Sequence, residues 1–240
     1  MSSQKVSVIT VVFNAAQLLK ETIESIRSQS YQNIEYFVID GGSTDGTLQV
    51  IEANSDIISS YVSEKDAGIY DAMNKGIAYA TGDWTIFLNA GDKFVDEETL
   101  SKVMCNVAND PKLVYGSVLL SGNGNTNRLE PKRLTFFSLL FWGTRTLCHQ
   151  SLLVHRDILI NYNSNYILKG ELDWYFRLIG HENYTYAQQL DFPVAEYLLG
   201  GVGQKKFVRN LVETIIVLTR HGGPLAIISL PVLIYRLLKY

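Results

Sequence analysis

Apolar and polar positions alternate along the first half of the chain in a pattern typical of strands and helices that follow one another. Four short runs rich in β-branched and aromatic residues predict strands covered on both faces. Between them, apolar residues recur every three or four positions, which predicts amphipathic helices. We expect strands at residues 5–13, 34–40, 57–63 and 84–88, helices at 16–30 and 68–80, and a helix capped by Ser43 or Thr44 that continues through Asn54.

The same alternation continues with a helix at residues 96–109 and a fifth strand at 113–120. It predicts an α/β fold with a mostly parallel, doubly wound sheet and helices on both faces. After residue 120 the pattern changes: residues 121–128 predict an exposed polar loop, and residues 134–147 are rich in aromatic residues without a clear period. The remaining elements are expected as strands at 151–155 and 192–199, and helices at 171–179, 207–220 and 225–238.

We predict one domain over residues 1–204 and a C-terminal helical segment over 205–240. The net charge of -3 conceals an asymmetry, because residues 205–240 contain six Lys and Arg and one acid, Glu213. An acidic body with a basic, apolar tail argues against nucleic acid and favours an anionic membrane surface. Residues 221–235 carry no Lys, Arg, Asp or Glu, but a bilayer takes about 20 apolar residues. An interfacial helix is favoured; a helix that closes the domain and a homodimer contact are the alternatives.

The chain opens without a signal-peptide pattern, and its two cysteines lack metal-ligand spacing. Cys105 and Cys148 are therefore expected as thiols in a reducing compartment. We predict a cytoplasmic protein that binds peripherally to the inner face of the membrane.

Polar residues follow all four N-terminal strands: Asn14, Asp40, Glu64 and Asn89. In open α/β sheets ligands bind beyond the carboxyl ends of the strands, so one shared cleft is favoured over four independent turns. A nicotinamide site is not expected, because NAAQLL follows the first strand without a glycine fingerprint. The GGSTDGT turn follows the second strand and lacks the lysine of a Walker loop.

Four motifs, VSVITVVFN, VIDGGSTDGT, SEKDAGIYDAMNKGI and GDWTIFLNAGD, resemble in order and spacing the family 2 glycosyltransferases of the inverting GT-A fold. The resemblance covers about residues 5–200. It implies transfer of a sugar from a nucleotide-diphosphate sugar, UDP-linked, to a hydroxyl of a glycan or polyprenyl-linked acceptor. Within the family, the chain is similar to bacterial enzymes that build cell-surface polysaccharides.

The resemblance implies that the nucleotide lies across the strand ends. Phe13 would line the base pocket beside Asn14, and Asp40 and Asp66 would hold the nucleotide. Many relatives carry a second acid directly after the first, where this chain has Gly41.

Lys75, which shares a helix face with Asn74, would reach a diphosphate oxygen; a solvated lysine is the alternative. The family's Asp-x-Asp usually occupies the position of residues 89–92, where only Asp92 is charged. We expect Mg²⁺ or Mn²⁺ bridging Asp92 and the diphosphate, with Asn89 adding a neutral oxygen. Charge neutralisation without a tight metal site is the alternative.

An inverting transfer needs a base for the acceptor hydroxyl and stabilisation of the leaving diphosphate. The stretch KGELDWYFRL resembles the family's base-bearing segment and places the catalytic carboxylate on Glu171, in preference to Asp173. Either acid could simply favour a helix N-terminus. His149 and Gln150 resemble a family block near the acceptor and diphosphate.

Two other classes of function remain open at this point. A catalytically inactive protein that binds sugar nucleotides or glycans would account for the missing Asp-x-Asp carboxylates. A nucleotidyltransferase is less favoured, because NAAQLL is not the glycine-rich, basic loop that such an enzyme would need after its first strand.

Overall fold

The computed structural model describes residues 4–122, 125–199, 207–229 and 231–232. Its strands are β1 (Val6–Val12), β2 (Ile34–Asp40), β3 (Ser60–Ser63), β4 (Trp84–Phe87), β5 (Lys93–Phe94), β6 (Leu113–Gly122), β7 (Asn125–Leu129), β8 (Leu152–His155) and β9 (Ala187–Leu198). Its α-helices are α1 (Ala16–Arg27), α2 (Thr47–Ala53), α3 (Ile69–Tyr79), α4 (Thr99–Asn106), α5 (Phe136–Trp142), α6 (Gly170–Ile179) and α7 (Phe207–Gly222). Short 3₁₀ turns include η2 (His149–Ser151) and η5 (Gly223–Leu225).

One sheet runs through the molecule in the order β3-β2-β1-β4-β8-β6-β9-β5, with β7 paired to β6. Strands β3, β2, β1 and β4 are parallel. β8 is antiparallel to both β4 and β6, so β6 and its parallel neighbour β9 run in the same direction as β1. The predicted α/β class with a mostly parallel, doubly wound sheet is confirmed.

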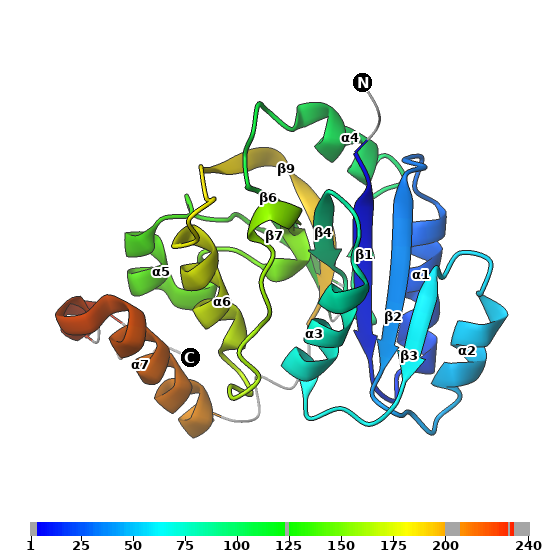
Figure 1. Cartoon of the computed structure of the whole chain (residues 1–240), viewed down its shortest axis with the longest axis horizontal. Helices are drawn as coiled ribbons and strands as arrows, with labels where there is room; N and C mark the ends of the chain where they lie inside the picture. Colours follow the sequence, from blue (N-terminus) through cyan, green and yellow to red (C-terminus); the bar gives the residue numbers. More distant parts are fainter. Residues whose placement is uncertain (1–3, 123–124, 200–206, 230, 233–240) are drawn as a thin grey trace.

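Helices cover both faces of this sheet (Figure 1). Along β1, Ile9 and Val11 point into the core beneath α3, α5, α6 and α7, whereas Val6, Val8 and Val12 point into the core beneath α1, α2 and α4. This alternation follows from the two-residue period of a strand. It explains why five of the seven residues of β1 are apolar.

The second half of the chain differs from the sequence-based prediction in several elements. The loop predicted at residues 121–128 is wrong: β6 and β7 pair as antiparallel strands there, and residues 123 and 124 lie outside the described residues. The polar sequence NTNRL of β7 lies at the edge of the sheet and is paired on one side only by β6. The two-residue strand β5 and helix α5 were not predicted, and β9 begins five residues earlier than expected.

α7 packs against α6 and contributes Val217 and Leu218 to the core on that face. His221 stacks on Phe176 of α6 with ring centroids 4.9 Å apart. The predicted boundary at residue 204 and half of the predicted helix at 225–238 lie outside the described residues. Within the described part, α7 belongs to the same packed body as α6.

Candidate active site

A cavity of about 570 Å³ opens where β4 and β9 end and η2 and α6 begin. Three predicted segments that are distant in the sequence meet there, at residues 89–92, 149–150 and 167–171. The cavity is lined by Leu18, Ile69, Tyr70, Asn89, Ala90, Asp92, His149, Gln150, Ile167, Leu168, Glu171, Tyr197, Leu198 and Leu199.

Glu171 lies in the first turn of α6 and forms a hydrogen-bonded unit with His149. Nδ1 of His149 is 3.0 Å from Oε2 of Glu171, and Nε2 is 3.3 Å from Nδ2 of Asn89. Since Nδ2 of Asn89 can only donate, Nε2 of His149 accepts from it. Nδ1 then carries the proton that His149 donates to the carboxylate.

The pKa of Glu171 is lowered from its ordinary value. Burial raises the pKa, but the hydrogen bond from His149, together with electrostatic attraction to Lys169, outweighs it. The side chain of Glu171 is still 23% exposed. It is therefore an ionised carboxylate in contact with the cavity, which is the state in which a carboxylate can accept a proton.

Gly170 allows the start of α6 to approach α3. A Cβ at this position would lie 2.6–2.8 Å from the ring of Tyr70. The absence of a side chain at residue 170 therefore sets the depth at which Glu171 enters the cavity.

Asp92 lies in the turn after β4 and is 4% exposed. Its Oδ2 accepts from Nε2 of Gln150 at 3.0 Å, and its Oδ1 accepts from the amide of Leu198 at 3.1 Å. Burial raises the pKa of Asp92 to about 6, although both hydrogen bonds act in the opposite direction. Asp92 thus joins the ends of β4 and β9 to η2.

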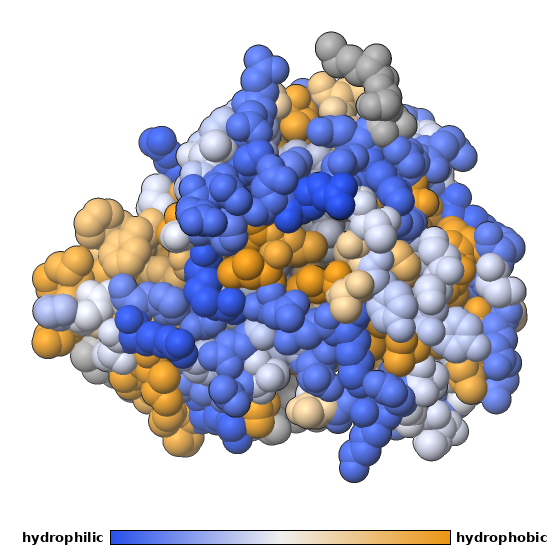
Figure 2. Space-filling model, in the orientation of Figure 1, coloured by the Kyte–Doolittle hydropathy of each residue, from blue (hydrophilic) through white to orange (hydrophobic). Residues whose placement is uncertain are grey.

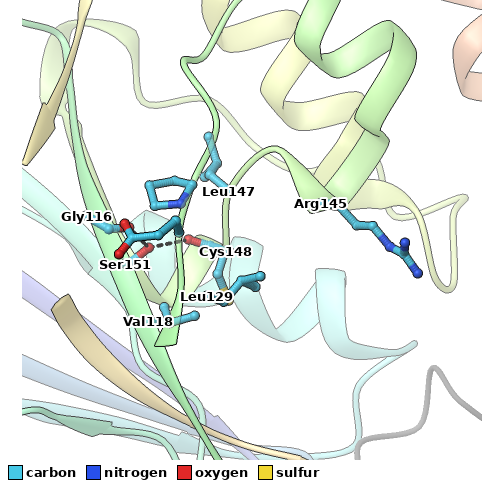
Figure 3. Close-up of a pocket in the computed structure, with 9 residues that line it drawn as sticks. Gly116, Val118, Leu129, Arg145, Leu147, Cys148 and Ser151 are labelled. Carbon is cyan, nitrogen blue, oxygen red and sulfur yellow. Dashed lines mark hydrogen bonds between the residues drawn. The ribbon is translucent and has the colours of Figure 1, made fainter. Parts of the chain in front are cut away.

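η2 is held on the sheet by Ser151. Its hydroxyl donates to the backbone oxygens of Gly116, at 2.9 Å, and Cys148, at 3.0 Å. Figure 3 shows Ser151 beside a small cavity of about 10 Å³, which has room for about one water molecule and none for a substrate. This anchor positions His149 and Gln150 for the larger cavity.

The predicted nucleotide side of the site lies at the ends of β1 and β2. Phe13 is 63% exposed, and Asp66 is half-buried with its Oδ1 accepting from the amide of Gly68. A Cβ at Gly41 would lie 2.7 Å from Oδ2 of Asp66 and 3.3 Å from Cδ2 of Phe13. The three residues therefore meet, and a second acid at position 41 would collide with Asp66.

A family model described as Glycosyl transferase family 2 matches residues 7–162, well over half of the chain. The chain belongs to glycosyl transferase family 2. It is a glycosyltransferase, and this family membership confirms the resemblance seen in the motifs.

Similar proteins support the same assignment. A PGL/p-HBAD biosynthesis glycosyltransferase of Mycobacterium bovis is 29% identical over 241 residues, covering 95% of this chain and 90% of the relative. An uncharacterized glycosyltransferase of Mycobacterium tuberculosis is 40% identical over 104 residues, 43% of this chain and 40% of the relative.

Two solved structures are similar in fold. S. aureus TarS 1–349 in complex with UDP-GlcNAc has a TM-score of 0.71 at 14% identity, over 90% of this chain and 67% of that chain. The mannosyltransferase PcManGT from Pyrobaculum calidifontis, in complex with GDP-Man and Mn²⁺, has a TM-score of 0.66 at 21% identity, over 93% and 68%. In a further structure of TarS 1–349, this chain spans 65% of the length of that chain.

Asp40 and Asn14, two predicted nucleotide ligands, form hydrogen bonds that hold the loop after β2. Asp40 is fully buried and accepts from the amide and hydroxyl of Ser43 and, at 2.7 Å, from the hydroxyl of Ser63. Asn14, in the left-handed region at φ 48°, accepts from the amide of Thr44 at 2.8 Å. Both shape the loop that begins at Gly41.

Asn74 and Lys75 are not among the residues that line the cavity. Both ends of the Asn74 amide bind the backbone of Tyr162, at 2.9 and 2.7 Å, which fixes a loop 88 residues away. Nζ of Lys75 pairs with Glu64 at 2.8 Å and lies 3.7 Å from Asp71. The hydrogen bond with Glu64 is the largest cause of the raised pKa of Lys75.

Asp173 is placed away from the cavity. Its side chain has no exposed surface and bonds to Nε of Arg177 at 2.7 Å and Nε2 of His221 at 2.8 Å. Burial raises its pKa, and these two partners outweigh burial, so the pKa is lowered. Of the two candidate bases, only Glu171 lines the cavity.

Asn89 and Asp92 are the residues predicted to hold a divalent cation. Within the described residues, no group of three His, Cys, Asp or Glu could hold a metal. Oδ1 of Asn89, however, is a buried oxygen without a hydrogen-bond partner, in the same cavity wall as the Asp92 carboxylate. These oxygens fit a hard cation that completes its shell with phosphate oxygens, since Mg²⁺ is often held by one or two carboxylates plus substrate phosphates.

Several lining residues were missed from the sequence. Tyr70, Ile167, Leu168, Tyr197 and Leu198 line the cavity, but all five are apolar or aromatic and look like core residues. Tyr197 could have been predicted from its position, because it lies near the carboxyl end of a strand parallel to β1.

Proposed function

We propose that this glycosyltransferase is an inverting enzyme that moves a sugar from a nucleotide-diphosphate donor, a UDP-sugar, to an acceptor hydroxyl. The observation that carries the proposal is the ionised Glu171 at the cavity wall, hydrogen-bonded to His149. A single displacement needs one base on the acceptor side and no second nucleophilic carboxylate. Asp173, the nearest other acid on α6, faces α7.

In this reaction the nucleotide lies by Phe13 and Asp66, and the diphosphate lies toward the turn at residues 89–92. Glu171 accepts the acceptor hydroxyl proton as the oxygen attacks the anomeric carbon and the bond to the diphosphate breaks. Asp92 and Asn89 would hold Mg²⁺ or Mn²⁺, which supplies positive charge for the leaving diphosphate. The Mn²⁺ bound with GDP-Man by the mannosyltransferase neighbour supports this assignment.

The deciding experiment compares wild type with Glu171→Gln. The isosteric amide cannot accept the proton, so we expect transfer to fall at least about 100-fold while nucleotide affinity stays within about threefold. Glu182→Gln, an exposed acid outside the cavity, is the matched control. Full transfer by Glu171→Gln would remove Glu171 as the base.

UDP-GlcNAc and GDP-Man, the donors named in the neighbouring structures, begin the donor panel. NMR of the product anomeric centre tests inversion. Donor binding without any transfer or hydrolysis by wild type would instead support a binding protein.

The proposed acceptor is a glycan or a polyprenyl-linked oligosaccharide, presented at the cytoplasmic face of a membrane. One helix, Val208–Ser229, is long and apolar enough to span a membrane by length and composition. Of its most apolar stretch of 18 residues, 33% is buried. Its outer face exposes large aliphatic side chains and two arginines, Arg209 and Arg220, while Glu213 is buried. Figure 2 shows apolar surface gathered on the side formed by α5 and α7. An apolar and basic face fits anionic lipid.

Co-sedimentation of the full chain with vesicles tests this surface. We expect binding to phosphatidylcholine vesicles containing phosphatidylglycerol, weaker binding to phosphatidylcholine alone, and loss in the double variant Val212→Glu, Ile216→Glu. Tyr61→Glu, at a similarly exposed position of β3, is the control. A dimer that the double variant disrupts, without vesicle binding, would assign this face to a second copy of the chain.

A further inference from the structure

Glu213 of α7 accepts hydrogen bonds from three consecutive backbone amides. Its carboxylate oxygens lie 3.2 Å from the amide of Ile167, 2.8 Å from that of Leu168 and 3.0 Å from that of Lys169. Nε of Arg209 binds the same carboxylate at 2.8 Å. The Glu213 side chain is 7% exposed, so this is a buried anion with a defined set of donors.

These three amides lead directly into α6. Lys169 is the N-cap residue of α6, so its amide is one of those without a partner within the helix, and its side chain provides no cap. Glu213 supplies the missing acceptor from a helix more than 40 residues later in the chain. A carboxylate also interacts favourably with the positive end of the helix dipole. Burial raises the pKa of Glu213, but the bonds from Arg209 and the three amides outweigh it, so the carboxylate stays ionised.

The segment that Glu213 holds is part of the cavity wall. Ile167 and Leu168, whose amides bind Glu213, line the cavity. Glu171, two residues beyond Lys169, lines it as well. The main chain between them has little freedom, because the ring of Tyr70 packs against Gly170. A shift of the capped amides would therefore move the Glu171 carboxylate relative to His149.

We propose that Glu213 is a positioning residue for the reaction: it fixes the main chain of residues 167–169 so that Glu171 meets His149 and the acceptor. The proposal rests on the role of Glu171 given above. It makes α7 part of the catalytic apparatus as well as a surface element. A geometric error of about 1 Å at a reacting group can cost about 100-fold in rate.

Hydrogen exchange tests the local effect without any need for activity. In Glu213→Ala, we expect the amides of residues 167–169 to exchange at least about tenfold faster than in wild type, with β1 and β2 unchanged. Glu213→Gln keeps an acceptor oxygen and should show a smaller increase. Unchanged exchange at residues 167–169 would overturn the proposal, whether or not the protein proves to be a transferase.

Kinetics then separate positioning from stability. Glu213→Ala should lower kcat for transfer about 10- to 100-fold with donor KM within about threefold, and Glu213→Gln should recover most of the rate. The matched control is Val217→Ala, which removes buried volume from the same helix one turn later. At a temperature where both variants are folded, Val217→Ala should keep kcat within about twofold. Equal losses in the two variants, or full activity of Glu213→Ala, would overturn the proposal.

Wild type with no transferase activity, combined with the expected exchange pattern, would overturn the proposed function and, with it, the positioning role. The bond between Glu213 and the amides of residues 167–169 would then stand as a structural feature only.

Discussion

Nδ1 of His149 lies 3.0 Å from Oε2 of Glu171, so the imidazole and the carboxylate form one unit at the cavity wall. The bond comes from the 3₁₀ turn η2 and joins it to the first turn of α6, 22 residues later. It is one of the interactions that lower the pKa of Glu171 against the effect of burial.

Removal of this bond should change the pH dependence of transfer. In His149→Ala, burial still raises the pKa of Glu171 but its hydrogen-bond partner is gone, so the pKa rises. Because the base works only when ionised, activity is lost as pH falls through that pKa, and the acidic limb of kcat should move to higher pH. At pH 7 we expect a loss of about 10- to 100-fold, the worth of a hydrogen bond to a charged group.

The measurement is kcat between pH 5 and 9 in wild type, His149→Ala and the surface control His181→Ala. An acidic limb at the same pH in all three proteins would contradict the role of His149.

Asp92 should make the protein less stable as pH rises. Its pKa is raised to about 6 in the folded state and is about 3.9 when unfolded, so the folded state binds the proton more tightly. The associated stability is fully present below about pH 4 and is lost as pH rises through about 6, a change of roughly 3 kcal/mol.

Urea denaturation in EDTA can test this for wild type and Asp92→Asn. Asparagine is neutral throughout, so the unfolding free energy of the variant should gain on wild type by up to about 3 kcal/mol between pH 4 and 7. A constant difference between the two proteins over this range would show that Asp92 is ionised normally.

Asn89→Asp should strengthen the dependence on a divalent cation. Oδ1 of Asn89 is buried without a partner beside Asp92, and a carboxylate there would add charge to the ligand set. We expect the Mn²⁺ concentration for half-maximal stabilisation of the UDP complex to fall about tenfold, and to rise in Asn89→Ala. Thermal unfolding in UDP with a Mn²⁺ series measures it. Equal values in all three proteins would place the cation elsewhere.

Gly41→Ala should weaken nucleotide binding with little loss of stability. The new Cβ would lie 2.7 Å from Oδ2 of Asp66, and this flexible carboxylate can rotate away from it. The displaced Asp66 should raise the Kd for UDP about 5- to 10-fold, measured by calorimetry. Thr44→Ala, an exposed position in the same loop, should bind as wild type does. Unchanged affinity in Gly41→Ala would remove Asp66 from the nucleotide site.

The sequence predicted the first half of the fold well, because β1, β2 and β4 are largely buried on both faces and each helix has an apolar stripe. β1, β2, β4, α1 and α3 lie within one or a few residues of their predicted positions. The segments at residues 89–92, 149–150 and 171 could be brought together only through the family motifs. The hydrophobic periodicity of the sequence does not indicate that these segments meet.

What the sequence could not predict depends on partners that are distant in the chain. Asn74 has the helical spacing of a ligand-binding residue, yet its amide is used by the backbone of Tyr162. Glu213 is one acid in a basic tail, and its role follows only from the position of the start of α6. NTNRL of β7 has the composition of a loop and becomes a strand because β6 provides its hydrogen-bonding partners.

The reversed direction of β8 separates two parts of the enzyme that can change independently. β8 lies antiparallel between β4 and β6. η2, which directly precedes β8, therefore lies at the end of the sheet where β1, β2 and β4 have their carboxyl ends. His149 and Gln150 therefore reach the cavity from the part of the chain that contains β7 and α5, outside strands β1, β2 and β4. Insertions or deletions in that part of the chain could alter acceptor selection during evolution while the nucleotide side is preserved.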